Sequence, residues 1–210
     1  MSHALKIVGS VALTLAVFVN ACVLGPSENS ATRTYFLNPE ISWHNPHGSR
    51  ERVGSAVLLI SQPKAQAGFD TQRMAYLLRP YEVDYYALNQ WADTPSRLLL
   101  RILVENLDKT GQWAAVLPAP SSLPANYRLD CDNLVLEQQF FSRPSRVRLA
   151  LRAQIVDLKK SAILGTQYFE LFESAPSDDP YGGVQAANRA AGKFLIELAP
   201  WLEKVLKTTD

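Results

Sequence analysis

The sequence predicts an α+β fold in which a mostly antiparallel sheet carries two long helices packed on one face. Runs rich in aromatic and β-branched residues alternate between apolar and polar side chains, which is the period of a strand. Two longer segments repeat their apolar residues every three or four positions, which is the period of an amphipathic helix. About seven strands and two helices of this kind would form a layered domain around one core.

The change from strand to helix is clearest between Met74 and Trp113. Two aromatic-rich runs, Met74–Leu78 and Tyr81–Leu88, are expected as strands on either side of a break at Arg79-Pro80. An amphipathic helix follows them. A pair of strands that leads into such a helix predicts that the helix lies against the sheet.

The first helix has signals at both ends. Thr94 is expected as its N-cap and Pro95 as its first helical residue. Gly111 comes just after the last apolar position and is expected to end the helix. The apolar stripe, which should be buried against the sheet, consists of Leu99, Ile102, Leu103 and Leu107.

The segment Arg146–Leu158 has the most regular alternation of the chain. Its apolar side chains fall on one face, and Arg146, Arg148 and Arg152 fall on the other. A short turn connects it to Ile163–Phe172, so the two segments are expected as an antiparallel hairpin.

A change of phase marks the strand before this hairpin. In Tyr127–Phe141 the apolar residues switch parity near Asp132-Asn133, which predicts a β-bulge at that point. Three shorter strands are expected at Thr34–Leu37, Ser55–Ile60 and Trp113–Leu117.

The second helix is expected to begin at Asp178-Asp179-Pro180, where acidic side chains complement the positive end of a helix. Pro200 should kink or divide it, because proline lacks the backbone donor and clashes with the preceding turn. Its apolar stripe consists of Val184, Ala187, Ala191, Phe194, Leu195, Leu198, Leu202 and Val205.

The start of the chain is expected to be a secretory signal peptide. Ile7–Val19 is an apolar run of 13 residues, which is too short to span a bilayer but typical of a signal-peptide core. Ala21 and Cys22 follow, and V-N-A-C resembles the bacterial lipobox, in which the cysteine carries fatty acyl chains such as palmitate. The alternative is an ordinary signal peptide that happens to precede a cysteine.

Three segments follow from this interpretation: a signal peptide (1–21), a lipidated N-terminus with a flexible tether (22–33), and one α+β domain (34–210). The part of the tether after Cys22 could extend at most about 36–40 Å. Val23 after the cysteine resembles the lipoproteins that are sorted to the outer membrane, so we expect an outer-membrane anchor facing the periplasm of a Gram-negative bacterium.

Charge and motifs exclude several functions. Removing Lys6 of the signal peptide from the 21 basic residues leaves 20 against 20 acidic ones, so no net field attracts nucleic acid. His44 and His47 lack a third ligand beside them, so we expect no metal and no cofactor. Cys131 is expected in the core. Without a nucleophile elbow, a zinc motif or a phosphate-binding loop, we expect no enzyme.

Several motifs resemble a known family. They are R-x-x-x-x-x-Y-Y before the first helix, W-A-D-T-P at Trp91–Pro95, and A-A-N-R-A-A-G-K-F in the second helix. In this order they resemble the ABC-type transport auxiliary lipoproteins, which are partners of mammalian-cell-entry (MCE) domain transporters. The resemblance implies a fold like the TolB N-terminal domain, a role in lipid movement across the envelope, and no catalytic residues. We interpret Trp91-Ala92-Asp93 itself as a structural start of the helix.

Three functions are consistent with these observations. The first is a non-catalytic outer-membrane lipoprotein of an envelope lipid transport system that docks to a periplasmic MCE partner and works with an ABC permease and ATPase. The others are a carrier that shelters a lipid in its own cavity and an envelope assembly scaffold. Because MCE proteins form rings, a homo-oligomeric ring is expected by resemblance. The candidate contacts with a partner or a lipid headgroup are Arg146, Arg148, Arg152 and Trp43, although a solvated strand face is the simpler interpretation of the arginines.

Overall fold

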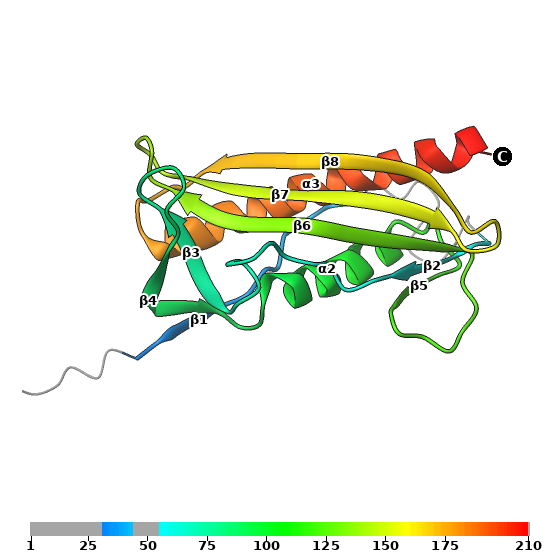
Figure 1. Cartoon of the computed structure of the whole chain (residues 1–210), viewed down its shortest axis with the longest axis horizontal. Helices are drawn as coiled ribbons and strands as arrows, with labels where there is room; N and C mark the ends of the chain where they lie inside the picture. Colours follow the sequence, from blue (N-terminus) through cyan, green and yellow to red (C-terminus); the bar gives the residue numbers. More distant parts are fainter. Residues whose placement is uncertain (1–30, 44–54, 210) are drawn as a thin grey trace, which may run out of the picture. The chain divides into compact units, whose positions relative to one another are not determined.

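Three long antiparallel strands form the centre of the fold (Figure 1). They are β6 (Tyr127–Gln139), β7 (Arg146–Asp157) and β8 (Ala162–Ser174). The computed structural model describes residues 31–43 and 55–209, and every structural statement below concerns these residues. Residues 32–210 form one compact unit. The antiparallel pairing of β7 with β8 confirms the expected hairpin.

Short strands continue the sheet beyond the other edge of β6. Near its start, β6 pairs with β2 (Val57–Ile60), which in turn pairs with β5 (Ala115–Pro118). Near its end, β6 pairs with β3 (Arg73–Leu77), and the sheet continues from there. The next strands are β4 (Asp84–Trp91) and β1 (Arg33–Tyr35).

The sheet is mixed rather than mostly antiparallel, which corrects the sequence-based expectation. β2 and β3 both run parallel to β6, β5 runs parallel to β2, and β1 runs parallel to β4. Parallel neighbours need crossover connections, and local alternation says nothing about where a crossover returns. The similarity to the TolB N-terminal domain stays a prediction.

Both helices cover the same face of the sheet. The helix α2 (Pro95–Lys109) contacts β2 and β5, whereas α3 (Pro180–Thr209) contacts β7 and β8. Side chains of both helices join one core with the inward residues of β6, β7 and β8. Leu103 and Phe194 are fully buried in this core, as the sequence predicted.

The ends of the helices differ in detail from the expectation. Thr94 does occupy the N-cap of α2, but its side chain makes no capping bond. The Asp93 carboxylate instead accepts a hydrogen bond from the Thr94 backbone N–H at 2.7 Å. Gly111, with φ of 71°, follows the end of α2 as predicted. Pro200 lies inside α3, which continues through it and is not divided.

The bulge in β6 and the start of β4 compare differently with the expectation. The predicted bulge is present, because the register between β6 and β7 shifts between Asp132 and Val135 and Asn133 has φ of 55°. The strand expected from Tyr81 starts only at Asp84. Tyr81 itself has φ of 69°, a left-handed conformation that belongs to a turn.

Candidate interaction surfaces

One face of the long strands carries no helix. Along β7 the residues Leu149 and Leu151 face the helices, while Arg148 and Arg152 lie on the other side. We call this second side the open face of β6, β7 and β8. Its middle is covered, where Phe69 packs on Val135 and Ala150.

The predicted arginine row lies on the open face, and each member has partners on the neighbouring strands. Nε of Arg148 donates to Glu170 at 2.8 Å, and Nη1 lies 3.5 Å from Oε1 of Glu137. Arg152 forms a two-pronged ion pair with Asp132. Its pKa is raised further above the usual value, because this carboxylate accepts its hydrogen bonds and attracts its charge.

Arg146 differs from the other two arginines. Its Nε donates to Oε1 of Gln139 at 3.0 Å, and its guanidinium carbon lies 4.3 Å from the centroid of the Phe172 ring, a cation–π distance. The row is therefore a ladder of arginines on a strand face, in which Arg148 and Arg152 are paired with carboxylates and Arg146 is held by an amide and a ring. This agrees with the simpler interpretation of a solvated strand face. A role in binding stays a prediction.

Two exposed aromatic side chains of β8 stand beside this ladder. Tyr168 is opposite Arg152 and Phe172 is opposite Arg148 in the strand register. Their exposed fractions are 64% and 41%, which is high for aromatic rings on a regular strand. Neither ring was among the candidates expected from the sequence, although their alternation along β8 was a usable signal.

Trp43 is placed differently from a free surface aromatic. Its ring packs against the main core and is only partly exposed. The indole Nε1 donates to Oδ1 of Asn106 at 3.2 Å, and Asn106 is buried in α2. Trp43 thus holds its segment against the helix, and its contact with a partner stays a prediction.

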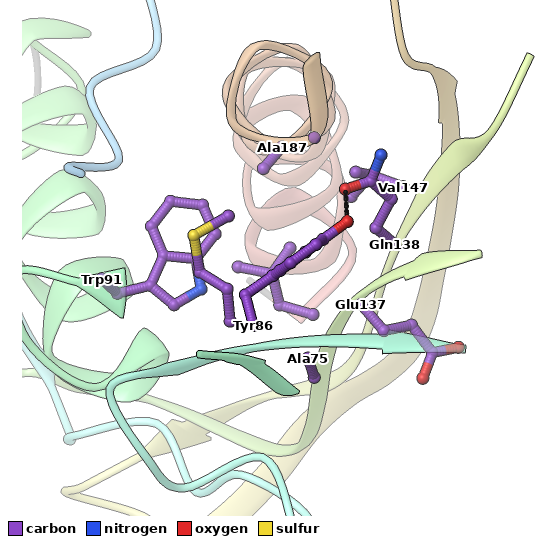
Figure 2. A pocket seen from close by; sticks show the side chains of 10 residues that line it. Ala75, Tyr86, Trp91, Glu137, Gln138, Val147 and Ala187 are labelled. Carbon is purple, nitrogen blue, oxygen red and sulfur yellow. Dashed lines mark hydrogen bonds between the residues drawn. The ribbon is translucent and has the colours of Figure 1, made fainter. Parts of the chain in front are cut away.

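A small cavity lies where β4, β6 and the start of α3 meet (Figure 2). Trp91 of the W-A-D-T-P motif lines it and is almost fully buried, in agreement with the structural interpretation of that motif. The cavity volume is about 10 Å³, which is the space of one water molecule. A second small cavity, between α2, α3 and the sheet, has the same volume of about 10 Å³.

A buried polar network lies beside the first cavity. In Figure 2 the Tyr86 hydroxyl points at Gln138, and it donates to Oε1 at 3.0 Å. Nε2 of Gln138 donates to Oγ of Ser145 at 2.9 Å and to the backbone oxygen of Asp179 at 3.2 Å. Burial raises the pKa of the Tyr86 hydroxyl. The network fixes the start of α3 to the sheet.

The motif in α3 that resembles the family also has a structural role. The Asn188 side chain accepts a hydrogen bond from the backbone N–H of Asn38 and donates to the backbone oxygen of Phe36. Arg189 donates to the backbone oxygen of Ser174 and to Glu173. These contacts attach the segment after β1 and the end of β8 to α3.

A wider hollow is a groove along α3, with a volume of about 600 Å³. Charged and amide side chains line it together with Tyr181, Val184 and Ile196. Its lining consists of Asn38, Glu40, Tyr181, Val184, Gln185, Asn188, Arg189, Gly192, Lys193 and Ile196.

Cys131 is buried in the core as predicted, and this burial raises the pKa of its thiol, so it is a poor nucleophile. Residues 31–43 and 55–209 contain no group of three metal-binding side chains. His44, His47 and Cys22 lie outside the described residues. In the described part of the chain, neither helix combines the length and hydrophobicity needed to cross a bilayer.

Comparisons with known proteins agree with these observations. A protein of the DUF330 family from Xanthomonas campestris has a TM-score of 0.75 at 20% identity, and the match covers 85% of this chain and 98% of that one. An uncharacterized protein has a TM-score of 0.62 at 13% identity over 82% of this chain and 99% of its own. These likenesses show the fold alone. No curated protein matches the chain. The family model of the ABC-type transport auxiliary lipoprotein component matches residues 35–199. The chain therefore belongs to this family of lipoprotein components.

Proposed function

We propose that the chain is a non-catalytic lipoprotein, anchored in the outer membrane through Cys22, that docks to a periplasmic MCE partner of an ABC-type lipid transporter. Family membership over residues 35–199 supports an auxiliary role in transport at the bacterial envelope. The anchor rests on the V-N-A-C sequence at residues 19–22. The MCE partner rests on the resemblance described above.

The open face is the observation that carries the docking proposal. A sheet face in water is normally covered or evenly polar, whereas this one combines paired charges with exposed Tyr168 and Phe172. Aromatic rings together with arginine are the side chains that protein interfaces favour. Because Arg148 and Arg152 are already paired with carboxylates, a partner would contact the rings without having to neutralise these two charges.

A lipid carrier is less well supported by the cavities. A carrier needs an apolar cavity that encloses most of its ligand. The two small cavities have room for about one water molecule each, and the groove along α3 lies open on the surface instead of enclosing a volume. Docking requires only a surface, so the described cavities favour docking over carriage.

Crosslinking in intact cells tests the proposal. A photoreactive amino acid placed at Tyr168 or Phe172 should capture an MCE-domain protein, and one at Trp43 should capture it less, because that ring is half-buried. Glu197, exposed on α3 away from the open face, is the matched control and should capture no partner. Capture of lipid alone at all four positions would favour the carrier. Conversion of a substrate into a product by the purified chain would contradict a non-catalytic role.

Self-association is a separate expectation. β8 pairs with β7 on one side, and no other described strand pairs with its second edge over 13 residues. Such an edge can add a strand from another copy. The size of the purified lipoprotein in detergent, measured by light scattering, would show a ring as a multiple of the chain mass.

A further inference from the structure

Exposed apolar side chains gather at one end of the sheet. The turn between β3 and β4 carries Leu78, Tyr81 and Val83, and the loop between β6 and β7 carries Phe141. Figure 1 shows the turn and the loop side by side at the end of the sheet where β1 and β4 also lie. We call these four residues the end cluster.

The two segments are held together by the sheet. β3 and β6 end side by side, with Leu77 opposite Gln139. The Phe140 backbone N–H donates to the oxygen of Leu77 at 2.9 Å, and the Phe140 ring meets the Tyr76 ring edge-on at 6.1 Å. The neighbouring Leu78 and Phe141 are therefore fixed at one end and directed away from the core.

Tyr81 has the least usual position in the end cluster. Its side chain is fully exposed, and its φ of 69° is uncommon for a bulky residue. A conformation of this kind costs free energy and is often retained for a function. A tyrosine ring with an apolar body and a polar tip suits the boundary between lipid headgroups and acyl chains.

The chain enters the domain from this same end. β1 runs parallel to β4, and Arg33 lies beside Asn89, five residues after the start of β4 at Asp84. At about 3.3 Å per residue, this places the entry roughly 17 Å along the sheet from the turn. The sequence between Cys22 and Arg33 can extend up to about 36–40 Å, so it allows the end cluster to reach the anchoring membrane.

Charges around the end cluster are balanced. Arg79 forms an ion pair with Glu82 in the turn. The hydrogen bonds from Ser145, and after them the charge of Arg143, lower the pKa of the Asp178 carboxyl. Attraction to anionic lipid is therefore not what the cluster offers. Insertion of apolar side chains into the interfacial layer is the contact that its chemistry allows.

We infer that the end cluster is a second, acyl-independent contact with the bilayer that carries the anchor, so that the domain stands with this end on the membrane. The inference rests on the proposed anchor at Cys22. A lipid surface is the proposed contact for two reasons. The tether enters at the same end, and the cluster consists of separate side chains on two projecting segments.

The test uses the acylated full-length mature chain, reconstituted in vesicles of phosphatidylethanolamine and phosphatidylglycerol. Leu78→Cys and Tyr81→Cys are each labelled with an environment-sensitive fluorophore, while Cys131 is buried and stays unlabelled. Ile163→Cys is the matched control, because Ile163 and Leu78 are both 61% exposed and Ile163 lies at the opposite end of β8. The fluorophores at 78 and 81 should show a blue-shifted emission, and doxyl-labelled lipid should quench that emission. The emission at 163 should be unchanged by doxyl-labelled lipid.

The outcomes separate this inference from the anchor. A chain that floats with the vesicles but shows equal quenching at 78 and 163, or none at 78, overturns the end cluster and leaves the anchor intact. A chain that does not float refutes the anchor and the inference together. In intact cells, a photoreactive residue at 81 should capture phospholipid. Capture of a protein there instead would overturn the lipid contact.

Discussion

Replacing Gly183 by alanine should disconnect the polar network at the start of α3. A Cβ atom at this position would lie 2.2 Å from Oε1 and 2.8 Å from Cδ of Gln138, so the amide must move. Gln138 then loses its bonds to Tyr86, Ser145 and Asp179. Three hydrogen bonds together contribute about 2–4 kcal/mol. Alanine recovers about 1 kcal/mol through its higher helix propensity, which leaves a net cost of about 1–3 kcal/mol.

A second substitution identifies the cause. Gln138→Ala removes the same three bonds and should cost about 2–4 kcal/mol by itself. In that background Gly183→Ala meets no amide and should stabilise the helix by up to about 1 kcal/mol. The two substitutions should therefore be non-additive by about 2–4 kcal/mol, in the direction of rescue.

Urea unfolding of residues 23–210, followed by circular dichroism, measures these free energies. Gly192→Ala is the control within α3, because its Cβ would lie 3.6 Å from Cβ of Pro39, an ordinary contact. This variant should be as stable as wild type or more stable. Additive costs for Gly183→Ala and Gln138→Ala would refute the reasoning, since the clash would then lie with some other group.

Three further predictions address the anchor and the core. Cys22→Ala should release the chain from the membrane fraction or leave it unprocessed, and normal outer-membrane fractionation of this variant would contradict the anchor. Leu103→Ala and Phe194→Ala should each cost about 2–5 kcal/mol in urea unfolding, and wild-type stability for both would mean that the helices do not form this layer. Cys131→Ala should remove a loss of stability above pH 9, the ordinary pKa of the thiol being 9.0. Burial raises the pKa of the thiol in the folded chain. Just above pH 9, therefore, the thiol ionises in the unfolded chain but not in the folded one, and unfolding is favoured. Urea titrations of both chains at rising pH check this difference.

Local patterns predicted the long elements correctly. Strict alternation in Arg146–Asp157 and helical spacing in Pro95–Lys109 are set by the side chains of each segment alone, and the structure shows both elements. The bulge near Asn133 was predictable for the same reason, since a change of parity must be absorbed within the strand. The parallel pairing of β2 and β3 with β6 was not, because it depends on where two crossovers return.

The candidate surfaces were predicted only in part. The sequence placed the arginines on one strand face, but their partners Glu170 and Asp132 depend on the register with neighbouring strands. Gln138 gave no signal, because Tyr86 and the Asp179 oxygen lie 52 and 41 residues away in the chain. Trp43 was a candidate contact from the sequence, which gave no sign that its indole N–H donates to Asn106, 63 residues away.

The difference between the tightly packed side of the sheet and its exposed surfaces indicates where partners can bind. Between the helices and the sheet, two cavities have volumes of about 10 Å³ each, so a ligand larger than water would have to separate packed layers to enter them. The open face and the end cluster need no such rearrangement. If the end cluster rests on the bilayer as proposed, β7 rises away from the membrane and the turn at its far end points into the periplasm. An MCE partner that arrives from the periplasm would then meet that turn first, and Tyr168 before Phe172. A photoreactive residue at 163 or 168 should therefore still capture the partner under conditions in which one at 172 captures none.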